Sequence, residues 1–290
     1  MSAKNMGRNI ASAIVLILIA SSLFSTLEYN TSNLEDIRSN PSFSHESIEG
    51  TTVDSPGDVG GFNSMTVDYQ SNIHIAYYDE TNKDLKYAFF DGFVWQNTVI
   101  DESGDVGEST SIAADSHGHI HICYFDETNG AIKYAYFDGQ NWNTSTVGSM
   151  SSGISSISLA VDNEDNLYVS YRDDWNIKYA TYNGTAWVSN LIGDDPRMAG
   201  SYSSLAVDED GNIHVSYNGI STTPKGLKYG FYNGTDWTIS SVENSGYSGY
   251  YNSIAVAENG NVFISLPVDG NITVLKHNGT DWMSLPQLPM

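Results

Sequence analysis

Lysine and aspartate residues recur at fixed positions along the chain and are the residues best suited to polar chemistry. Four lysines each stand in the tetrapeptide [LI]-K-Y-[AG], in a chain with only 12 Lys and Arg residues. The lysines are Lys86, Lys133, Lys178 and Lys228, and the aspartates that precede the first three are Asp79, Asp126 and Asp173. Side chains of opposite charge on neighbouring strands can form an ion pair or can offer hydrogen bonds to a polar ligand.

Two interpretations of this repeated pattern are open. The first, which we favour, is a structural ion pair across two strands of every repeat. The second is a repeated ligand pocket, in which Asp and Lys form hydrogen bonds and nearby aromatic rings stack on a sugar. Arg172 and Trp175 extend the second interpretation, because Trp175 departs from the repeat and is expected on a loop, where recognition residues are common.

Three histidines also share one repeat position: His74, His121 and His214. Repeated histidines suggest metal binding, since imidazole is a common zinc ligand. However, Tyr168 and Phe263 hold the same position in the other repeats. A position that accepts His, Tyr or Phe favours packing of a flat ring, so we predict no metal site from these histidines.

A serine nucleophile and a reactive cysteine are both poorly supported. One serine opens the first strand of each repeat, and no G-x-S-x-G motif surrounds any of them. These serines are Ser64, Ser111, Ser158, Ser204 and Ser253. We interpret them as small residues near a crowded axis, and a ring of hydroxyls that binds water or an ion is the alternative. Cys123 is the only cysteine, so no internal disulfide forms, and we predict that it packs in the core.

The repeat itself has a period typical of propellers. Five tryptophans recur every 45–50 residues, at Trp95, Trp142, Trp187, Trp237 and Trp282. Each unit holds four short segments rich in Val, Ile, Tyr, Phe and Thr, and D-x-x-G-N and Asp-Gly or Asn-Gly turns separate them. In the second unit the segments are Ser111–Asp115, His119–Phe125, Ile132–Phe137 and Asn141–Val147. The sequence therefore predicts an all-β protein, a β-propeller of four-stranded antiparallel blades.

Five units predict five blades, and an incomplete sixth blade is the alternative. Thr51–Gly60 matches Thr98–Gly107, which predicts a spare strand at about residues 47–54. Pro286 and Pro289 make the C-terminal segment a poor strand, because proline cannot donate to a ladder. We therefore expect the N-terminal strand to pair within or beside the last blade and to help close the ring.

Three regions differ in composition. Residues 1–27 have Lys4 and Arg8 before the apolar run Ile10–Phe24, as in a signal peptide or an uncleaved N-terminal anchor. A polar linker is expected over residues 28–46, followed by the propeller over residues 47–290. The predicted repeats are about 55–101, 102–148, 149–193, 194–244 and 245–290. Because of this N-terminal segment, we expect the protein to be secreted or to lie at the cell surface.

Net charge limits the partners. The formal charge is −23, from 35 acidic residues against 12 basic ones, which argues against nucleic acid and anionic membranes. The acidic loops would suit a hard cation such as Ca²⁺, but no D-x-D-x-D-G ladder is present, so calcium is only weakly supported and no other cofactor is expected.

The motifs resemble a known group of repeats. The half-motif S-[IL]-A-V-D-x-x-G-N-[IV]-[HFY]-[IV] is similar to NHL-type propeller repeats. With H-I-x-Y-x-D, L-K-Y-A and N-G-T-x-W added, the pattern resembles exported propeller repeats of archaea and bacteria that are grouped with sialidase-like domains. The period of about 47 residues is also similar to that of five-bladed, tachylectin-type lectins. The resemblance covers about residues 50–290 and implies architecture more than activity.

The loops between the second and third strands and the loops between blades vary in length among the repeats, and we call the face that they form the variable-loop face. These observations favour a non-enzymatic binding module whose variable-loop face recognises a glycan or an extracellular protein. The alternatives are a glycoside hydrolase of a sialidase-like class and a purely structural module at the cell surface. A sialidase would need three arginines, and residues 50–290 contain only Arg172 and Arg197. The S-x-D-x-G-x-[ST]-W box of that family is absent as well. No residue is therefore predicted to be catalytic.

Overall fold

The computed structural model describes residues 50–55, 57–150, 156–174, 176–193, 200–219, 226–242, 249–268 and 270–285. The chain divides into two compact units, Met1–Ser55 and Pro56–Met290, and all the strands belong to the second. Within the described residues there is no helix, and hence none that is long and apolar enough to cross a membrane. The predicted signal peptide and linker lie outside the described residues.

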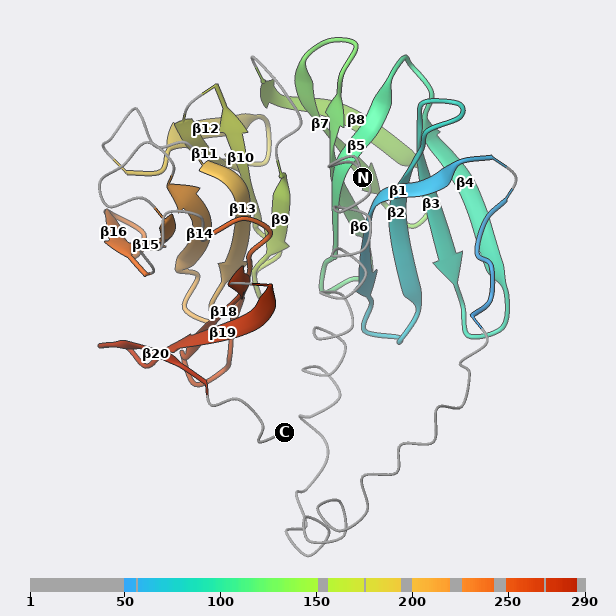
Figure 1. The fold of residues 1–290 in the computed structure, drawn as a ribbon. Coiled ribbons are helices and arrows are strands. Elements are labelled where there is room, and N and C mark those ends of the chain that lie inside the picture. Colours follow the sequence, from blue (N-terminus) through green and yellow to red (C-terminus); the bar gives the residue numbers. More distant parts are fainter. Residues whose placement is uncertain are drawn as a thin grey trace, which may run out of the picture. The chain divides into compact units, whose positions relative to one another are not determined.

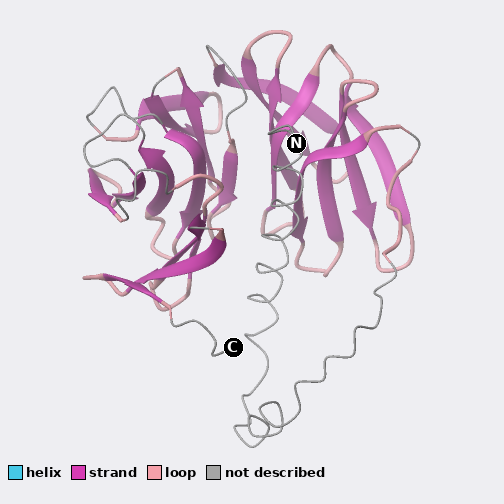
Figure 2. Cartoon of the chain, in the orientation of Figure 1, coloured by secondary structure: helices cyan, strands magenta, loops and turns pink. Residues whose placement is uncertain are grey.

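Twenty strands form five antiparallel four-stranded sheets, and each sheet pairs four consecutive strands (Figures 1 and 2). The first sheet contains β1 (Val59–Val67), β2 (Ile73–Asp79), β3 (Asp84–Phe90) and β4 (Trp95–Asp101). The second contains β5 (Val106–Ala114), β6 (Ile120–Asp126), β7 (Ala131–Phe137) and β8 (Trp142–Ser149). The third contains β9 (Ser158–Val161), β10 (Leu167–Asp173), β11 (Asn176–Tyr182) and β12 (Trp187–Leu191).

The last two sheets repeat this order of strands. The fourth contains β13 (Gly200–Val207), β14 (Ile213–Gly219), β15 (Gly226–Tyr232) and β16 (Trp237–Ser241). The fifth contains β17 (Ser253–Val256), β18 (Val262–Val268), β19 (Asn271–His277) and β20 (Trp282–Ser284). The all-β class and the five four-stranded blades predicted from the sequence are confirmed.

The N-terminal strand expected to complete the last blade is not formed by the part of that segment that the structure describes. Residues 50–55 are in no strand. The fifth sheet instead takes its fourth strand from the C-terminal segment, as β20 pairs with β19 through Leu275 and Ser284. Pro286 does not prevent this pairing because β20 ends two residues before it.

An aspartate side chain caps the turn between the first and second strands in the first four sheets. In the fourth sheet, Asp208 Oδ1 accepts hydrogen bonds from the backbone N–H groups of Asp210 (3.0 Å) and Asn212 (2.8 Å). The Asn212 side chain donates to Asp208 Oδ2 at 2.9 Å. Gly211 has a φ of +78°, which glycine adopts readily. The D-x-x-G-N motif is therefore a turn with its own internal caps.

The hydrophobic core lies between successive sheets, as four clusters of buried side chains. Ile122, Val169, Val215 and Ile264 stand at one position of the second strands and are fully buried. Cys123 is also fully buried, as the sequence predicts, and burial raises the pKa of its thiol. Each sheet thus stabilises its neighbours by burying apolar side chains against them, and the middle sheets do so on both faces.

The repeated serines connect neighbouring sheets through hydrogen bonds. Each hydroxyl oxygen accepts from the backbone N–H group of the residue that follows the equivalent serine in the next sheet. The pairs are Ser64 with Ile112 (3.3 Å), Ser111 with Leu159 (2.9 Å), Ser158 with Leu205 (3.0 Å) and Ser204 with Ile254 (3.2 Å). The small residue is needed because a backbone amide of the next sheet approaches it.

The repeated tryptophans also pack between sheets. Four of them meet a tyrosine of the preceding sheet edge to face, with ring centroids 5.0–5.3 Å apart. The pairs are Tyr87 with Trp142, Tyr134 with Trp187, Tyr179 with Trp237, and Tyr229 with Trp282. This geometry is favourable for aromatic rings and accounts for the period of the tryptophans.

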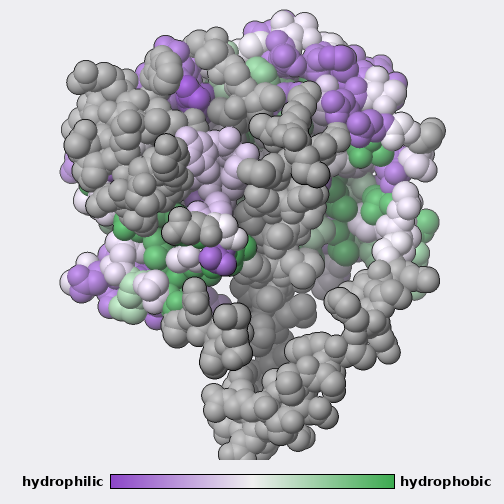
Figure 3. Space-filling model, viewed as in Figure 1, coloured by the Kyte–Doolittle hydropathy of each residue, from purple (hydrophilic) through white to green (hydrophobic). Residues whose placement is uncertain are grey.

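Polar and apolar side chains gather in different places on the face of the described residues that Figure 3 shows. On the face shown in Figure 3, hydrophilic side chains (purple) predominate along the upper edge, and hydrophobic side chains (green) appear in smaller patches below it. This distribution fits a formal charge of −23. The apolar residues of the repeats lie largely in the contacts between sheets.

Candidate functional site

In the first sheet the predicted Asp and Lys lie close together, but the aspartate is engaged in a turn. Asp79 is 1% exposed, and its carboxylate accepts hydrogen bonds from the backbone N–H groups of Thr81 and Asn82, both at 3.0 Å. Lys86 Nζ lies 3.8 Å from Asp79 Oδ2 and 5.8 Å from the centre of the Tyr77 ring. This Asp therefore supports the loop between the second and third strands.

In the second sheet the lysine pairs mainly with an aspartate that the sequence did not single out. Lys133 Nζ donates to Asp101 Oδ2 and lies 4.0 Å from Asp126 Oδ2. The buried Tyr124 hydroxyl also donates to Asp101, at 2.6 Å. Burial alone would raise the pKa of Asp101, but the hydrogen bonds from Lys133, Ser103 and Tyr124 outweigh it and lower that pKa.

In the third and fourth sheets the repeated lysines have other hydrogen-bond partners. Lys178 Nζ donates to Asp173 Oδ2 at 2.6 Å, and the Arg172 side chain donates to the backbone oxygen of Asp174, also at 2.6 Å. Lys228 is 4% exposed and donates to Ser241 Oγ at 2.6 Å. Trp175 lies outside the described residues. The predicted binding residues are thus distributed over four sheets rather than gathered at one site.

Two of the buried histidines, His121 and His214, each form a chain of hydrogen bonds with an aspartate and a tyrosine. His214 Nε2 lies 3.1 Å from Asp208 Oδ2, and its Nδ1 lies 2.6 Å from the Tyr229 hydroxyl. Because an ionised carboxylate only accepts, His214 donates from Nε2 and accepts from tyrosine at Nδ1. Burial lowers the pKa of His214, and the Asp208 carboxylate opposes this shift without cancelling it. His214 is therefore neutral near pH 7.

This burial predicts a loss of stability in mild acid. A lowered histidine pKa in the folded state means that the unfolded chain binds the proton more readily. The contribution is complete above the unfolded pKa, about 6.5, and is lost as the pH falls below it. Replacing His214 by tyrosine, as at Tyr168, whose hydroxyl donates to Asp162 at 2.9 Å, should reduce the fall in melting temperature between pH 7 and pH 5. An unchanged pH dependence would contradict this role.

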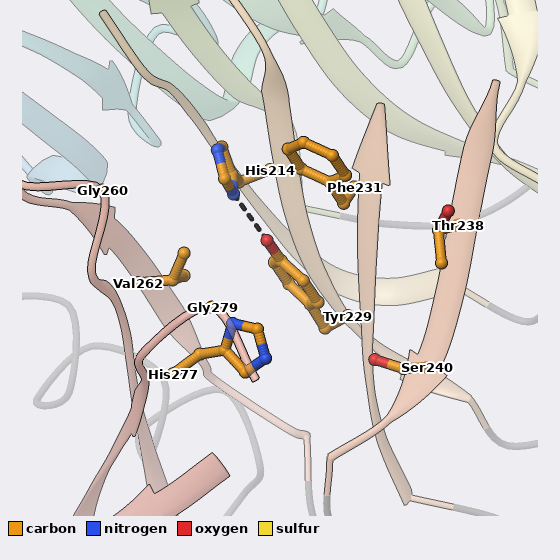
Figure 4. A pocket seen from close by; sticks show the side chains of 9 residues that line it. All are labelled: His214, Tyr229, Phe231, Thr238, Ser240, Gly260, Val262, His277 and Gly279. Carbon is orange, nitrogen blue, oxygen red and sulfur yellow. Dashed lines mark hydrogen bonds between the residues drawn. The ribbon is translucent and has the colours of Figure 1, made fainter. Parts of the chain in front are cut away.

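A pocket lies between the fourth and fifth sheets (Figure 4). Its volume is about 360 Å³, within the range of small-ligand sites. Its lining residues are His214, Tyr229, Phe231, Thr238, Ser240, Gly260, Val262, His277 and Gly279. They come from β14, β15, β16, β18 and β19 and from two turns of the fifth sheet.

The pocket combines aromatic rings with hydroxyl and imidazole groups. His214 and Tyr229 are buried and linked by the hydrogen bond drawn in Figure 4, while Thr238 and Ser240 are exposed along β16. His277 faces Tyr229, and the centroids of the two rings are 5.9 Å apart. The centroids of the His277 and Trp282 rings are 4.9 Å apart. The side chains can therefore stack on a flat apolar face and exchange hydrogen bonds with hydroxyl groups.

Sequence reasoning missed this pocket, although a signal for it exists. His277 stands where the other repeats carry Phe90, Phe137, Tyr182 and Tyr232. The divergence of the fifth repeat was visible in the sequence, but the space that a smaller ring leaves depends on packing between two sheets. None of the nine lining residues is an aspartate, glutamate, lysine or arginine.

Comparisons with solved structures define the class of protein. The structure is similar to Aleuria aurantia lectin in complex with Fucα1-6GlcNAc, with a TM-score of 0.57, 12% identity and 78% coverage of each chain. It is also similar to a Dyadobacter fermentans protein of unknown function, with a TM-score of 0.56, 11% identity and coverage of 82% of this chain and 86% of that one. The chain is therefore a β-propeller repeat protein, with five four-stranded blades.

Enzymes share this fold too. An ulvan lyase of polysaccharide lyase family 25, bound to -[GlcA(1-4)Rha3S]-, matches with a TM-score of 0.52, 14% identity and coverage of 77% of this chain and 71% of that one. The NanB sialidase of Streptococcus pneumoniae matches with a TM-score of 0.54 and 9% identity, over 78% of this chain and 60% of the enzyme. At sequence identities this low, the similarity to these structures shows a shared fold and not a shared activity. No protein-family model and no curated protein sequence matches the chain.

Proposed function

We propose that this protein is a secreted, non-enzymatic propeller that binds carbohydrate in the pocket between its fourth and fifth sheets. The observation that carries the proposal is the pairing of the Tyr229 and His277 rings with the hydroxyl groups of Thr238 and Ser240 around one cavity. A pyranose presents one apolar face and a rim of hydroxyl groups, which suits such a lining. The ligands in the structures of the lectin and the lyase are likewise saccharides.

The location of this pocket differs from the variable-loop face that the sequence favoured. Gly260 lies in the turn between β17 and β18, and Gly279 lies in the turn between β19 and β20. Both turns belong to the end of the sheets where short, uniform turns are found. The segments that connect β8 to β9, β12 to β13, β14 to β15 and β16 to β17 include residues 151–155, 194–199, 220–225 and 243–248, which lie outside the described residues.

The chemistry of the pocket supports binding over catalysis. A two-carboxylate glycosidase needs an acid and a base or nucleophile at the sugar, and the lining holds no carboxylate. Burial raises the pKa of Tyr229, and its hydroxyl is engaged with His214, so it is poorly suited to act as a base. Elimination at a uronate would also need a cation to stabilise the enolate, and no lysine or arginine lines the cavity.

A glycan array with the purified chain, run with calcium and with a chelator, tests the proposal. We expect binding to a limited set of sugars, independent of calcium. Replacing His277 by phenylalanine, the residue at Phe90 and Phe137, should weaken that binding at least tenfold, because the larger ring fills the cavity and removes a hydrogen-bonding group.

The matched control is Ser145, which pairs with Tyr134 as Ser240 pairs with Tyr229 but lies in the second sheet. Ser145→Ala should leave sugar binding unchanged, whereas Ser240→Ala should weaken it. A blank array in both conditions, or equal binding by the wild-type chain and His277→Phe, would contradict the proposal. Hydrolysis of a bound glycan during the assay would contradict its non-enzymatic part.

A further inference from the structure

The turn between β5 and β6 differs from the same turn in the other four sheets. It reads Asp115-Ser-His-Gly-His, so that two histidines flank Gly118. Where His119 stands, the other sheets carry Asn72, Asn166, Asn212 and Asn261. Where His117 stands, they carry Gln70, Glu164, Asp210 and Asn259. Only this turn places two imidazoles beside the capping aspartate.

The three side chains converge. Asp115, His117 and His119 each offer one ligand atom, and these atoms all lie within 4.8 Å of one another. The two imidazole rings are stacked, with centroids 5.7 Å apart and planes inclined by 17°. The His117 side chain is 68% exposed and that of His119 is 31% exposed. An ion at this position could therefore keep water as its remaining ligands.

A carboxylate from the next sheet holds one of the histidines. Asp165, in the turn between β9 and β10, accepts hydrogen bonds from the backbone N–H and the hydroxyl of Ser116, both at 2.8 Å. Its Oδ2 lies 3.0 Å from His117 Nδ1. If His117 binds an ion through Nε2, the Asp165 carboxylate at Nδ1 is the usual support of a metal-binding histidine, because it fixes the orientation and raises the basicity of the ring.

Packing in the turn explains only part of this arrangement. His119 Nδ1 lies 2.9 Å from Asp115 Oδ2, which replaces the bond from the Asn72 side chain to Asp68 in the first sheet. The capping role thus accounts for His119. It does not account for His117, whose ring faces Asp165 and stacks on His119 instead of capping the turn.

We propose that Asp115, His117 and His119 form a binding site for a divalent transition metal, with Asp165 positioning His117. Two imidazoles and one carboxylate favour Zn²⁺ and its neighbours, Co²⁺, Ni²⁺ and Cu²⁺, over Ca²⁺ and Mg²⁺, which prefer oxygen ligands alone. The formal charge of −23 would raise the local concentration of any cation. This site is separate from the proposed sugar pocket in its residues and its sheets.

Isothermal titration of the full chain with Zn²⁺, in excess Mg²⁺ to occupy nonspecific carboxylates, tests the site. One Zn²⁺ per chain is expected at the tightest step. The double variant His117→Gln and His119→Asn recreates the first-sheet residues Gln70 and Asn72 and should therefore fold, as its melting temperature without zinc will check. It should bind at least about 100-fold more weakly. Asp165→Gly should lose about 10-fold, the effect expected of an outer-shell partner.

The control is His74→Tyr, the same substitution in the first sheet, which follows Tyr168. Because His74 is buried, is bonded to Tyr87 at 2.6 Å and lies in a different sheet from the three ligands, this variant should bind Zn²⁺ as tightly as the wild-type chain. The proposal would be overturned by absence of stoichiometric Zn²⁺ binding in the wild-type chain. Equal affinity in a folded double variant would overturn it too.

Discussion

Gly107→Ala is expected to destabilise the protein by about 2–5 kcal/mol, as measured by urea denaturation. Gly107 has a φ of +110°, a region that costs alanine about 1–2 kcal/mol. An added Cβ would also lie 2.8 Å from Leu85 Cα and 3.0 Å from Leu85 N in the neighbouring sheet. Backbone atoms cannot move aside as a flexible side chain would, so the clash should add about 1–3 kcal/mol.

Gly60 provides the matched control for this prediction. It occupies the same repeat position in the first sheet and has a φ of +93°, but no atom would lie within 4 Å of a Cβ added there. Gly60→Ala should therefore cost only the conformational part, about 1–2 kcal/mol. Equal losses for the two variants would mean that the sheets do not approach as closely at Leu85 as the structure places them.

Replacing Lys133 by methionine is expected to cost about 3 kcal/mol at pH 7, because it leaves the Asp101 carboxylate, 7% exposed, without its cation. The methionine side chain is unbranched and only one heavy atom shorter than that of lysine, so little packing is lost. The pKa of Asp101 is lowered in the folded protein, and its contribution is therefore present above the unfolded pKa and lost as the pH falls through the folded value. The difference between wild type and variant should shrink in strong acid.

Lys178→Met is the comparison for this variant. Lys178 pairs with Asp173 at 2.6 Å, but its side chain is 28% exposed and that of Asp173 is 15% exposed. Solvent screens such a pair, so the loss should be about 1 kcal/mol or less. Both losses can be read from urea midpoints at several pH values. If the two variants lost equal stability, burial of Asp101 would not be the reason for its importance.

Much of the architecture follows from the sequence, because each repeat carries its own turns. The segment Ile132–Phe137 matches β7 to within one residue, since alternating residues and an Asp-Gly turn define it. The segment Ser111–Asp115, by contrast, overlaps the end of a longer strand, β5, which begins at Val106 and ends at Ala114. Its pairing with β6 has register shifts on both sides of Glu108, and in this stretch Gly107 lies against Leu85 of the neighbouring sheet, a contact that no local pattern reveals.

Relations between sheets account for the other differences. The ion pair predicted for Lys133 forms mainly with Asp101, which belongs to the end of the fourth strand and not to the second strand. The repeated serines follow the same rule, since each accepts a hydrogen bond from a neighbouring sheet. The period and composition of the repeats are enough to predict the strands. The partners of side chains in neighbouring sheets depend on how the sheets pack together, and the spacing of residues in the sequence does not show this.

The candidate sites are harder to predict from the sequence than the strands are. His277 and His117 each differ from the residues at the same position of the other repeats. Each becomes part of a candidate site only through a residue of another sheet, which is Tyr229 for His277 and Asp165 for His117. Averaging over repeats identifies the residues that build the scaffold. The departures from the average are the positions where recognition is expected, provided that the fold brings partners to them.

The most direct test of the central claim is a crystal structure of the chain with the best monosaccharide from the glycan array. We predict a sugar ring between the fourth and fifth sheets, stacked near Tyr229 and His277 and hydrogen-bonded to Thr238 or Ser240. A sugar bound elsewhere on the propeller, with this pocket empty, would contradict the assignment of the pocket even if the array is positive.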